Sequence, residues 1–510
     1  MKDKKIPSKI LDLKTIAGLC AKAKKEGKKV VYCHGCFDLM HIGHIKYLQA
    51  ARKRGDVLVV TITPDRYVTR GPGRPVFTEI HRLESIAALD CVDYVALNQW
   101  PTAVESIHLL KPNFYIKGSD FGSVEGDPTG RLVKEEEAVK SINGELVFTN
   151  EEVFSSSKLL KDYFGVLPKE LEKFLVGFTQ RFNTNDIIGV FDSIKDLRVL
   201  VIGEPIIDEY NFCSLLQRAS KAPTVATRWA SSETYAGGSL AVANHLAGLV
   251  KEVGLIGLLG RKDSREEFIR ANLQPNIQFF PCFRDDSSTI IKTRFLEEAF
   301  KQKMFEVCYF NDYPINGKTE EETISLLKKL LTNYDLVISA DFGHGFITRE
   351  IINLLCKEAP YLVVMAQSNS ANLGFNPVTK YHRADYIVVD HVEIRLACHE
   401  QHSDLEPLVR NISKRLKCPR INVTLGHEGT LYYHSNTFYR VPVASWKVVD
   451  TIGAGDAVLA VTSPLTYLNL DAQVVAFIGN CAGALAVQYL GNKERINPAH
   501  LRKLIETLMK

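Results

Sequence analysis

The sequence predicts an α/β protein with two doubly wound domains, and three observations support that prediction. Short apolar runs rich in Val and Ile alternate with amphipathic helical segments, which is the pattern of parallel strands joined by helices. Two such series occur, and residues 166–196, which show helical periodicity only, separate them. The chain of 510 residues is also longer than most single domains.

Composition excludes several classes of protein. The 63 basic and 59 acidic residues give a net charge of only +4, without the basic excess of a nucleic-acid-binding protein. No apolar run is long enough to span a bilayer, and the N-terminal residues lack the apolar segment of a signal peptide. The 11 cysteines are scattered and odd in number, which favours a reducing compartment. We therefore expect a cytoplasmic protein with no membrane and no nucleic-acid partner.

The first part of the chain divides into an N-terminal extension and a first domain. In the extension, residues 1–27, apolar residues at helical spacing predict a short amphipathic helix. Residues 28–165 then alternate strands and helices and predict the first α/β domain. The expected strands are 30–33, 56–63, 92–97 and 114–118, and the expected helices are 44–55 and 78–89.

The rest of the chain contains a connector and a second domain. Residues 166–196 are amphipathic and predict a helical connector between the domains. Residues 197–510 return to alternating strands and helices and predict a second α/β domain. Its expected strands are 197–204, 334–341, 361–366, 385–390 and 421–426, and a long helix rich in small residues is expected at 472–491.

A candidate phosphate site follows the first expected strand. His41, Gly43 and His44 form an HxGH sequence at an expected helix start, where free N–H groups and the helix dipole attract phosphate. Displacement at an α-phosphate places charge on its oxygens and on the departing pyrophosphate, so this chemistry needs positioned donors. Both imidazoles can point at one anion, and Gly43 lets the backbone approach it. The alternative interpretation is two histidines that only cap a helix.

The segments around this site resemble those of the cytidylyltransferase-like nucleotidyltransferases. They are GCFDLMHIGHIKYLQAARKRGD, TPDRYVTRGPGRPV, IHRLESIAALDCVDYV, YIKGSDF and VFSSSKLL. The greatest likeness is to the nucleotidyltransferase half of the bifunctional heptose-7-phosphate kinase/heptose-1-phosphate adenylyltransferases. The resemblance implies a Rossmann-like fold in which His41, His44 and Lys117 are catalytic. It also implies that Phe37, Asp38, Gly43, Ser155, Ser156 and Ser157 shape or bind the phosphate site, and it leaves Arg74 and Arg82 as either further candidates or solvated surface residues.

A second candidate site precedes an apolar stretch near the C-terminus. The sequence DTIGAGD places Gly453, Ala454 and Gly455 at an expected helix start, where small residues form a backbone anion hole for a transferring phosphoryl group. Asp456 follows them, and a carboxylate at the edge of such a hole can accept the proton of an attacking hydroxyl. The alternative interpretation is a plain helix cap with an aspartate in the first turn.

The second domain resembles the ribokinase-like (PfkB) sugar kinases over about residues 197–510. The complete DTxGAGD sequence carries the likeness, together with VIGEPIIDEY, YAGGSLAVANHLAGL and VTLGHEG. The resemblance implies that Asp456 is the catalytic base and that Asp208 ends the first strand and contacts the sugar. It further implies sugar contacts for Gly237 and Gly238, and phosphate or nucleotide contacts for Gly453, Ala454, Gly455, Thr424, Gly426, Gly429 and Asn480.

Several features depart from the heptose enzymes. The asparagine expected after the two glycines is Ala241, and AQSNSANLGF at 366–375 replaces an Asp-Pro-Lys stretch. The Asn-x-x-Glu near the phosphates and magnesium becomes Asp390 and Glu393, which are expected to contact Mg²⁺ indirectly. The domain order is also expected to be reversed relative to the heptose enzymes. The kinase acceptor is therefore expected to differ from heptose 7-phosphate.

These features predict a bifunctional transferase, a sugar kinase joined to a nucleotidyltransferase, that makes an ADP-heptose-like nucleotide sugar for surface polysaccharide. The expected cofactor is Mg²⁺, with ATP as phosphoryl donor and ATP or CTP as nucleotidyl donor. The expected partners are sugar phosphates and nucleotides, and a homo-oligomer is left open. One alternative is a CTP-dependent enzyme that makes a CDP-linked polyol or sugar. Another is a nucleotide-sugar-binding or scaffolding protein with a decayed kinase domain, against which the intact Asp456 argues.

Overall fold

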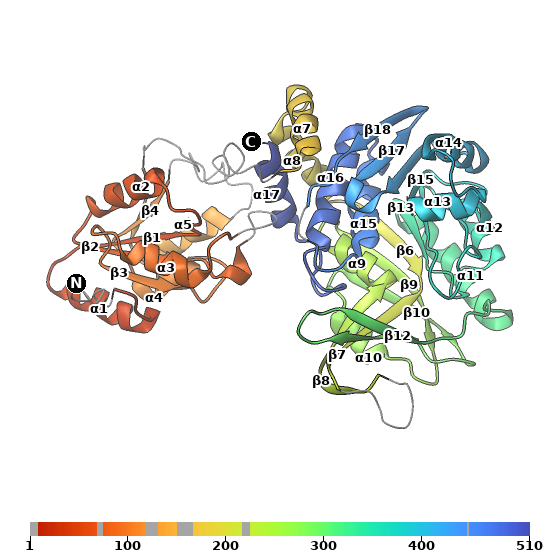
Figure 1. The fold of residues 1–510 in the computed structure, drawn as a ribbon, viewed down its shortest axis with the longest axis horizontal. Helices are drawn as coiled ribbons and strands as arrows, with labels where there is room; N and C mark the ends of the chain where they lie inside the picture. Colours follow the sequence, from red (N-terminus) through yellow and green to blue (C-terminus); the bar gives the residue numbers. More distant parts are fainter. Residues whose placement is uncertain are drawn as a thin grey trace. The chain divides into compact units, whose positions relative to one another are not determined.

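The chain divides into two compact units, which are drawn in Figure 1. The computed structural model describes residues 9–68, 75–118, 131–149, 167–216, 225–445 and 448–509. The first unit contains residues 1–169 together with 502–510, and the second contains residues 170–501. Among the described residues, no helix combines the length and the apolar character needed to cross a membrane.

The first unit contains a five-stranded sheet in the order β3-β2-β1-β4-β5. All of its strand pairs are parallel, so the carboxyl ends of the strands lie at one edge. The order reverses between β1 and β4, and ligands of open α/β sheets bind outside the carboxyl ends at such a position. The strands are β1 (Val30–Gly35), β2 (Val57–Ile62), β3 (Tyr94–Leu97), β4 (Phe114–Lys117) and β5 (Glu145–Phe148).

Helices cover both faces of this sheet because alternate residues of each strand point to opposite sides. Val30 and Tyr32 pack with α1, α4 and α5, whereas Val31 and Cys33 pack with α2 and α3. The helix predicted in the N-terminal extension is α1, and it belongs to the core of this unit. The helices are α1 (Leu13–Lys25), α2 (Ile42–Arg52), α3 (Glu79–Ala87), α4 (Val104–Leu110) and α5 (Arg131–Ser141).

The second unit is built on a nine-stranded sheet in the order β10-β9-β6-β13-β14-β15-β16-β17-β18. Its strands are parallel from β10 to β16, and β17 and β18 add antiparallel pairs at one edge. The strands are β6 (Arg198–Gly203), β9 (Glu252–Gly260), β10 (Ile277–Arg284), β13 (Leu336–Asp341), β14 (Leu362–Ala366), β15 (Tyr386–Asp390), β16 (Arg420–Thr424), β17 (Thr430–His434) and β18 (Thr437–Val441).

Helices also cover both faces of the large sheet. Helices α11, α12, α13 and α14 contribute to a large apolar cluster on one face. On the other face, α15 contacts both α9 and α16, and all three helices contact strands. The helices are α9 (Ser239–Ala247), α10 (Glu266–Asn272), α11 (Gly317–Leu330), α12 (Arg349–Glu358), α13 (His391–Cys398), α14 (Leu405–Leu416), α15 (Ala454–Tyr467) and α16 (Ala472–Ala486). The last helix, α17 (Pro498–Met509), begins in the second unit, and its residues from Arg502 onward are assigned to the first.

Helices α7 (Lys169–Arg181) and α8 (Thr184–Ser193) form from the predicted connector. Phe178 of α7 packs on Phe477 of α16, with ring centroids 4.6 Å apart, and the Arg181 guanidinium donates to the Gln473 side chain. This segment therefore contributes apolar contacts to the second unit.

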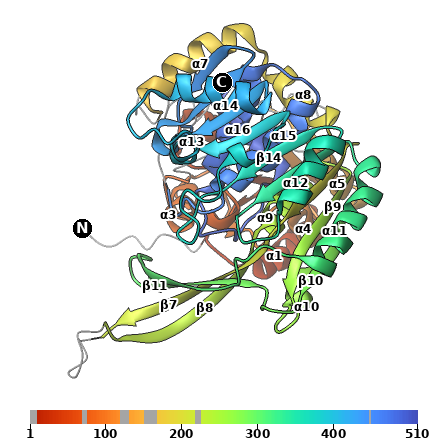
Figure 2. The same ribbon diagram turned by 90° about the vertical axis from the view of Figure 1, so that its right-hand side faces the viewer.

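A separate four-stranded sheet, called the small sheet below, was not predicted. Its order is β12-β11-β7-β8, and Figure 2 shows β7, β8 and β11 extending from the rest of the second unit. Asp208 lies on β7, so the prediction that it ends the first strand is wrong: β6 already ends at Gly203. The strands are β7 (Pro205–Leu215), β8 (Thr227–Gly238), β11 (Ile290–Glu297) and β12 (Lys303–Tyr309). Polar residues interrupt their apolar pattern, because much of β8 and β12 is exposed.

Candidate active sites

The HxGH residues meet at the N-terminus of α2, just beyond the carboxyl end of β1. The His41 Nδ1 atom accepts a hydrogen bond from the Gly43 N–H at 3.1 Å, so His41 caps the helix. The His41 and His44 rings stack with centroids 3.9 Å apart. Both imidazoles and the first turn of α2 can therefore act on the same bound group.

Phe37 and Asp38 shape the loop that leads into this helix. The Phe37 ring meets the His44 ring edge-on at 5.5 Å, and Phe37 adopts a left-handed backbone with φ of 49°. The Asp38 carboxylate is buried and accepts hydrogen bonds from the N–H groups of Val76 and Phe77, at 3.0 and 3.1 Å. Asp38 therefore ties the 76–77 backbone to the loop.

Lys117 lies at the end of β4, beside β1, and is part of a buried ion pair. Its ammonium is 2.8 Å from the Glu135 carboxylate, which also accepts a hydrogen bond from the Tyr115 hydroxyl at 2.9 Å. Burial alone would raise the pKa of Glu135, but the Lys117 charge and the hydrogen bonds hold it below its ordinary value. Sequence reasoning missed Glu135, although it shares one face of α5 with the buried Leu132 and Val139.

Arg82 is neither a surface arginine nor a residue free to bind substrate. Its side chain is 1% exposed, and its guanidinium donates to the backbone carbonyls of Cys36, Thr63 and Phe77 and to the Asp65 carboxylate. The solvated interpretation is therefore wrong, and the contacts give Arg82 a role in joining loops at the sheet edge. The other predicted residues of this unit, Arg74, Ser155, Ser156 and Ser157, lie outside the described residues.

In the second unit, the DTxGAGD sequence forms the N-terminus of α15. Gly453 is the cap residue, with φ of +83°, and a Cβ there would meet the Asn492 side chain at 2.1 Å. The first N–H groups of a helix have no partner within it, and Ala454 and Gly455 belong to this first turn. No atom of the described residues would obstruct a Cβ at Gly455, which lines a cavity of about 370 Å³.

Asp456 lines the same cavity, and its environment suits a general base. The side chain is buried, and Oδ1 has no hydrogen-bond partner among the described residues. Burial, followed by the nearby Asp208 charge, raises the pKa of Asp456 to about 7, although Lys292 acts in the opposite direction. A base with a pKa near the working pH is effective in proton transfer.

The small sheet supplies the opposite wall of this cavity. Asp208 on β7 accepts a hydrogen bond from Arg294 Nη1 at 2.5 Å, and Arg294 Nε is 2.7 Å from the Glu306 carboxylate. A Cβ at Gly237 would lie 1.9 Å from Asp208 Oδ2, so only glycine fits beside this carboxylate. Sequence reasoning missed Lys292 and Arg294, which line the cavity, although two cations at alternate positions of an apolar run are a signal for one charged strand face.

Gly238 closes the turn between β8 and α9. Its φ is +60°, and a Cβ there would lie 2.5 Å from the Glu204 carbonyl oxygen. Gly238 also lines the cavity with Asp208 and Asp456, so the structure brings these predicted residues together.

The four residues predicted to bind nucleotide, Thr424 at the end of β16, Gly426, Gly429 and Asn480, are not among the described residues that line this cavity. Thr424 Oγ1 contacts the Asp390 carboxylate at 3.4 Å, and Gly426 begins a short 3₁₀ turn. Gly429 has φ of +96° and packs against the Val441 carbonyl. The Asn480 amide bonds to backbone atoms of residues 441, 442 and 444, so it holds a loop.

Asp390 and Glu393 form a capping box at the start of α13. Asp390 accepts from the Val392 N–H at 2.8 Å, and Glu393 accepts from the Asp390 and Ser368 N–H groups at 2.7 and 2.9 Å. Burial raises the pKa of Glu393 to about 7. Within the described part of the chain, no three His, Cys, Asp or Glu side chains converge as a metal site. Two carboxylates are compatible with a contact to Mg²⁺ through water, because Mg²⁺ prefers oxygen ligands, commonly keeps several waters and is held mainly by substrate phosphates.

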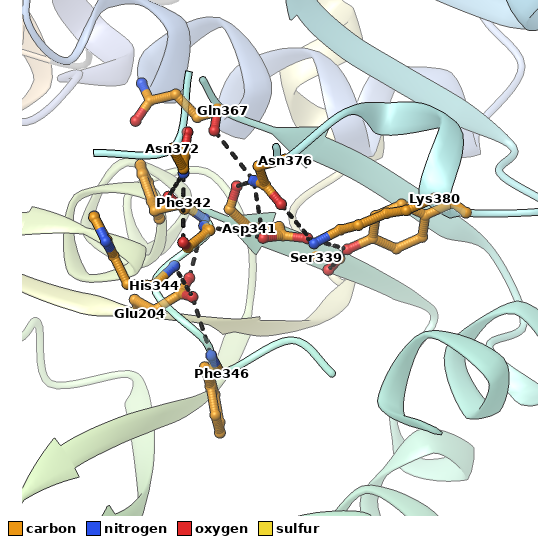
Figure 3. A network of polar contacts seen from close by, with 12 residues as sticks. Glu204, Ser339, Asp341, Phe342, His344, Phe346, Gln367, Asn372, Asn376 and Lys380 are labelled. Atoms are coloured by element: carbon orange, nitrogen blue, oxygen red, sulfur yellow. Dashed lines mark hydrogen bonds and ion pairs between the residues drawn. The ribbon is translucent and has the colours of Figure 1, made fainter. Parts of the chain in front are cut away.

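A buried polar network, shown in Figure 3, supports another wall of the cavity. The Glu204 carboxylate accepts from the N–H groups of Phe342 and His344, each at 3.0 Å. The Asn372 amide donates to the Phe342 carbonyl at 3.0 Å, and the Asn376 amide donates to the Gln367 carbonyl at 3.1 Å. Phe342 and Gln367 line the cavity, so Asn372, within the 366–375 segment, and Asn376, directly after it, hold that wall in place.

Two family models match this chain. Residues 196–499 match the pfkB family carbohydrate kinases, and residues 32–161 match a cytidylyltransferase-like model. The chain belongs to the pfkB family of carbohydrate kinases. The fold prediction, α/β with a nucleotidyltransferase-like region before a ribokinase-like domain, is confirmed. The expectation of a reversed domain order is wrong. The cytidylyltransferase-like residues 32–161 precede the pfkB residues 196–499, and this order is not a reversal.

Relatives of this pfkB-family chain match its N-terminal part. Bifunctional protein HldE of Citrifermentans bemidjiense is 47% identical over 130 residues, which are 25% of this chain and 26% of the relative. Bifunctional protein HldE of Geobacter metallireducens is 45% identical over 116 residues, 22% of this chain and 24% of the relative. The chain thus matches about a quarter of the length of these relatives.

Solved structures resemble the chain in fold. Phosphofructokinase-2 from Escherichia coli in complex with substrates and products is 15% identical, with a TM-score of 0.50, and covers 62% of this chain and 100% of its own. The same enzyme in complex with potassium is 16% identical, with the same TM-score and the same coverage. At this identity the likeness concerns the fold alone.

Proposed function

We propose that the chain is a bifunctional enzyme in which the second unit phosphorylates a sugar or sugar phosphate and the first unit makes a nucleotide-activated sugar. The observation that carries the proposal is Asp456: a buried carboxylate, with its pKa raised to about 7, at the edge of a cavity that begins at a helix N-terminus. The HldE relatives and the cytidylyltransferase-like match support the first unit's part.

In the kinase reaction, Asp456 accepts the proton of an acceptor hydroxyl. That oxygen forms a bond to the γ-phosphorus of ATP while the bond to the ADP oxygen breaks. The N–H groups of the first turn of α15 stabilise the charge on the transferring group. In this proposal Asp208, which accepts a hydrogen bond from Arg294 and lines the cavity, holds a hydroxyl of the acceptor.

In the nucleotidyltransferase reaction, a phosphate oxygen of a sugar 1-phosphate attacks the α-phosphorus of a nucleoside triphosphate, and pyrophosphate leaves. His41, His44 and the N-terminus of α2 donate to the phosphate oxygens as charge develops there. Lys117, held by Glu135, supplies a further positive charge at the same sheet edge. By this proposal the product is ADP-heptose-like and serves surface polysaccharide synthesis.

Mg²⁺ neutralises the nucleotide phosphates when it is bound. Asp390 and Glu393 would hold its waters, and ATP would be the phosphoryl donor. The alternative is a CTP-dependent first unit that makes a CDP-linked polyol or sugar. It stays open because the HxGH residues and the serines at 155–157 are expected to contact phosphates, and such contacts do not distinguish adenine from cytosine.

Two coupled assays on the full chain test this proposal. The first follows ADP formation from ATP with a panel of sugars and sugar phosphates, including heptose 7-phosphate, which is expected to be a poorer acceptor than another member. The second follows pyrophosphate release from ATP or CTP with sugar 1-phosphates and polyol phosphates. Turnover in both assays supports a bifunctional enzyme. Nucleotide binding without turnover in either would favour the scaffolding alternative.

A further inference from the structure

The second unit contains another cavity besides the kinase cavity that Asp456 lines. It is called the His245 cavity below, and its volume of about 360 Å³ is within the range of small-molecule sites. Strand β8, helix α9, the end of α16 and residues 492–497 supply its walls. Among the described lining residues, only Asn492 is shared with the kinase cavity, so the two cavities adjoin but have separate linings.

His245 of α9 brings an unsatisfied hydrogen-bond donor to this cavity. The residue lines the cavity and is only 3% exposed. Its Nδ1 atom accepts a hydrogen bond from the Ile496 N–H at 3.0 Å, and burial lowers its pKa to about 4. The imidazole is therefore neutral near pH 7 and carries its proton on Nε2. The Nε2 atom has no partner among the described residues, so a ligand with an acceptor atom would satisfy it.

The interior of the cavity suits a planar, uncharged group. A neutral donor in a buried position favours a ring nitrogen or a carbonyl oxygen, because a buried anion would lack a counter-charge there. Tyr489 lines the same cavity and offers an aromatic ring. Proteins bind nucleobases by stacking them on aromatic side chains and by hydrogen bonds to their edges. His245 and Tyr489 therefore supply both kinds of contact.

The mouth of the cavity carries positive charge. Lys493 and Arg495 are exposed and line the cavity, with Glu494 between them in sequence. The Lys493 ammonium is 3.0 Å from the Glu233 carboxylate, whereas the Arg495 guanidinium forms no ion pair among the described residues. A guanidinium binds phosphate through paired hydrogen bonds. Arg495 is therefore available to a phosphate group at the mouth.

We propose that the His245 cavity binds a nucleoside phosphate, with the base inside against His245 and Tyr489 and the phosphate at the mouth beside Arg495. The site goes beyond the proposed function, because it shares neither the Asp456 cavity nor the HxGH residues. Its occupancy can be measured as binding, without turnover in either unit.

Crystals of the full chain grown with 8-bromo-AMP locate the base directly, because bromine scatters X-rays anomalously. The bromine is expected inside the His245 cavity, with the phosphate beside Arg495. Ordered water alone in this cavity, or bromine only in the kinase cavity or the first unit, would overturn the proposal.

Calorimetric titration of AMP into the full chain measures what each side chain contributes. His245→Phe keeps an aromatic ring but removes the donor, and it should weaken AMP binding about 2- to 10-fold. Arg495→Gln should weaken it about 10-fold, because charge-assisted hydrogen bonds to phosphate are the stronger ones. Arg495 is exposed, so its substitution tests the site even if loss of the Ile496 contact unfolds His245→Phe. Equal AMP affinity in wild type and Arg495→Gln would contradict the assignment.

The matched control is Arg349→Gln, which removes an exposed arginine that does not line the cavity and should leave AMP binding unchanged. Adenosine lacks the phosphate and D-ribose 5-phosphate lacks the base, so each should bind about 10-fold or more weakly than AMP. If either fragment binds as tightly as AMP, the ligand class is wrong. AMP binding by a chain that shows no turnover would leave this site in place and count only against the proposed function.

Discussion

The two candidate sites of this chain are assembled in different ways. In the first unit, Phe37, His41 and His44 lie within eight residues and meet at one helix N-terminus. In the second, Asp456 meets Asp208 across a cavity, although nearly half of the chain separates them in sequence. The first site needs one strand and one helix to form, whereas the second needs the small sheet to pair correctly. Local motifs therefore describe the first site well and the second only in part.

The largest loss of activity is expected at Asp456, because the kinase reaction depends on this one carboxylate. Asp456→Asn removes the proton acceptor and should lower the kinase kcat by about 10²–10⁴-fold. Pyrophosphate release by the other unit should be unchanged, because the base belongs to one unit only. Parallel assays of ADP and pyrophosphate check this, and near-wild-type kinase turnover would remove Asp456 from the mechanism.

Mutations in the first site should lower its kcat somewhat less than Asp456→Asn lowers the kinase kcat. His41→Ala or His44→Ala should lower kcat for pyrophosphate release by about 10²–10³-fold with little change in KM, because the donors act on charge that develops in the transition state. His81→Ala, at an exposed histidine of the same unit, is the control. If turnover survives and stability drops by only about 1 kcal/mol, the histidines are caps and the unit has another active site.

A stability measurement tests whether the first site also depends on tertiary contacts. Glu135→Gln removes the charge of the carboxylate that lies 2.8 Å from the buried Lys117 ammonium and should reduce the free energy of unfolding by about 3 kcal/mol. Glu136→Gln, whose partner Lys140 is mostly exposed, should change it by less than about 1 kcal/mol. Urea denaturation of both variants gives the comparison. Equal changes in the unfolding free energy of the two variants would show that the buried ion pair stabilises the protein no more than the exposed one.

The pH dependence of that pair follows from the direction of the shift. The pKa of Glu135 in the folded protein is below its ordinary value of 4.5, so its stabilisation is present above that pH and is lost as the pH falls below it. The difference in unfolding free energy between wild type and Glu135→Gln should therefore shrink under acid conditions.

The smallest effect concerns the titration of Asp456. Because its pKa is raised to about 7, the kinase kcat/KM should fall about tenfold per pH unit below 7 and level off above it. The sign for stability is the opposite: the protonated form is favoured in the folded state, so stability from this group is lost as the pH rises from 3.8 through about 7. Asp456→Asn should accordingly be more stable than wild type at pH 8. A flat activity profile between pH 5 and 8 would contradict the assigned base.

For some residues the sequence predicts that the side chain is important but does not predict its hydrogen-bond partners. The sequence indicates Arg82 as a candidate site residue. Only the tertiary structure shows that its guanidinium donates hydrogen bonds to backbone carbonyls of neighbouring loops. Asn480 could be placed on a late helix, but its amide holds the 441–444 backbone. A hydrogen-bonding side chain has several possible partners, and the sequence contains no information on which of them the tertiary structure brings near.

The sequence by itself determined the α/β class, the position of most strands and helices, and the two helix N-termini that can hold phosphate. These features depend on hydrophobic periodicity and on glycine or histidine at adjacent positions, which are local properties. Only the tertiary structure decided that Asp208 belongs to a second sheet, that Arg294 pairs with it and that Lys292 enters the kinase cavity. The physical reason is that strands β7 and β11 pair across more than 80 residues, so their register depends on contacts that no local pattern specifies.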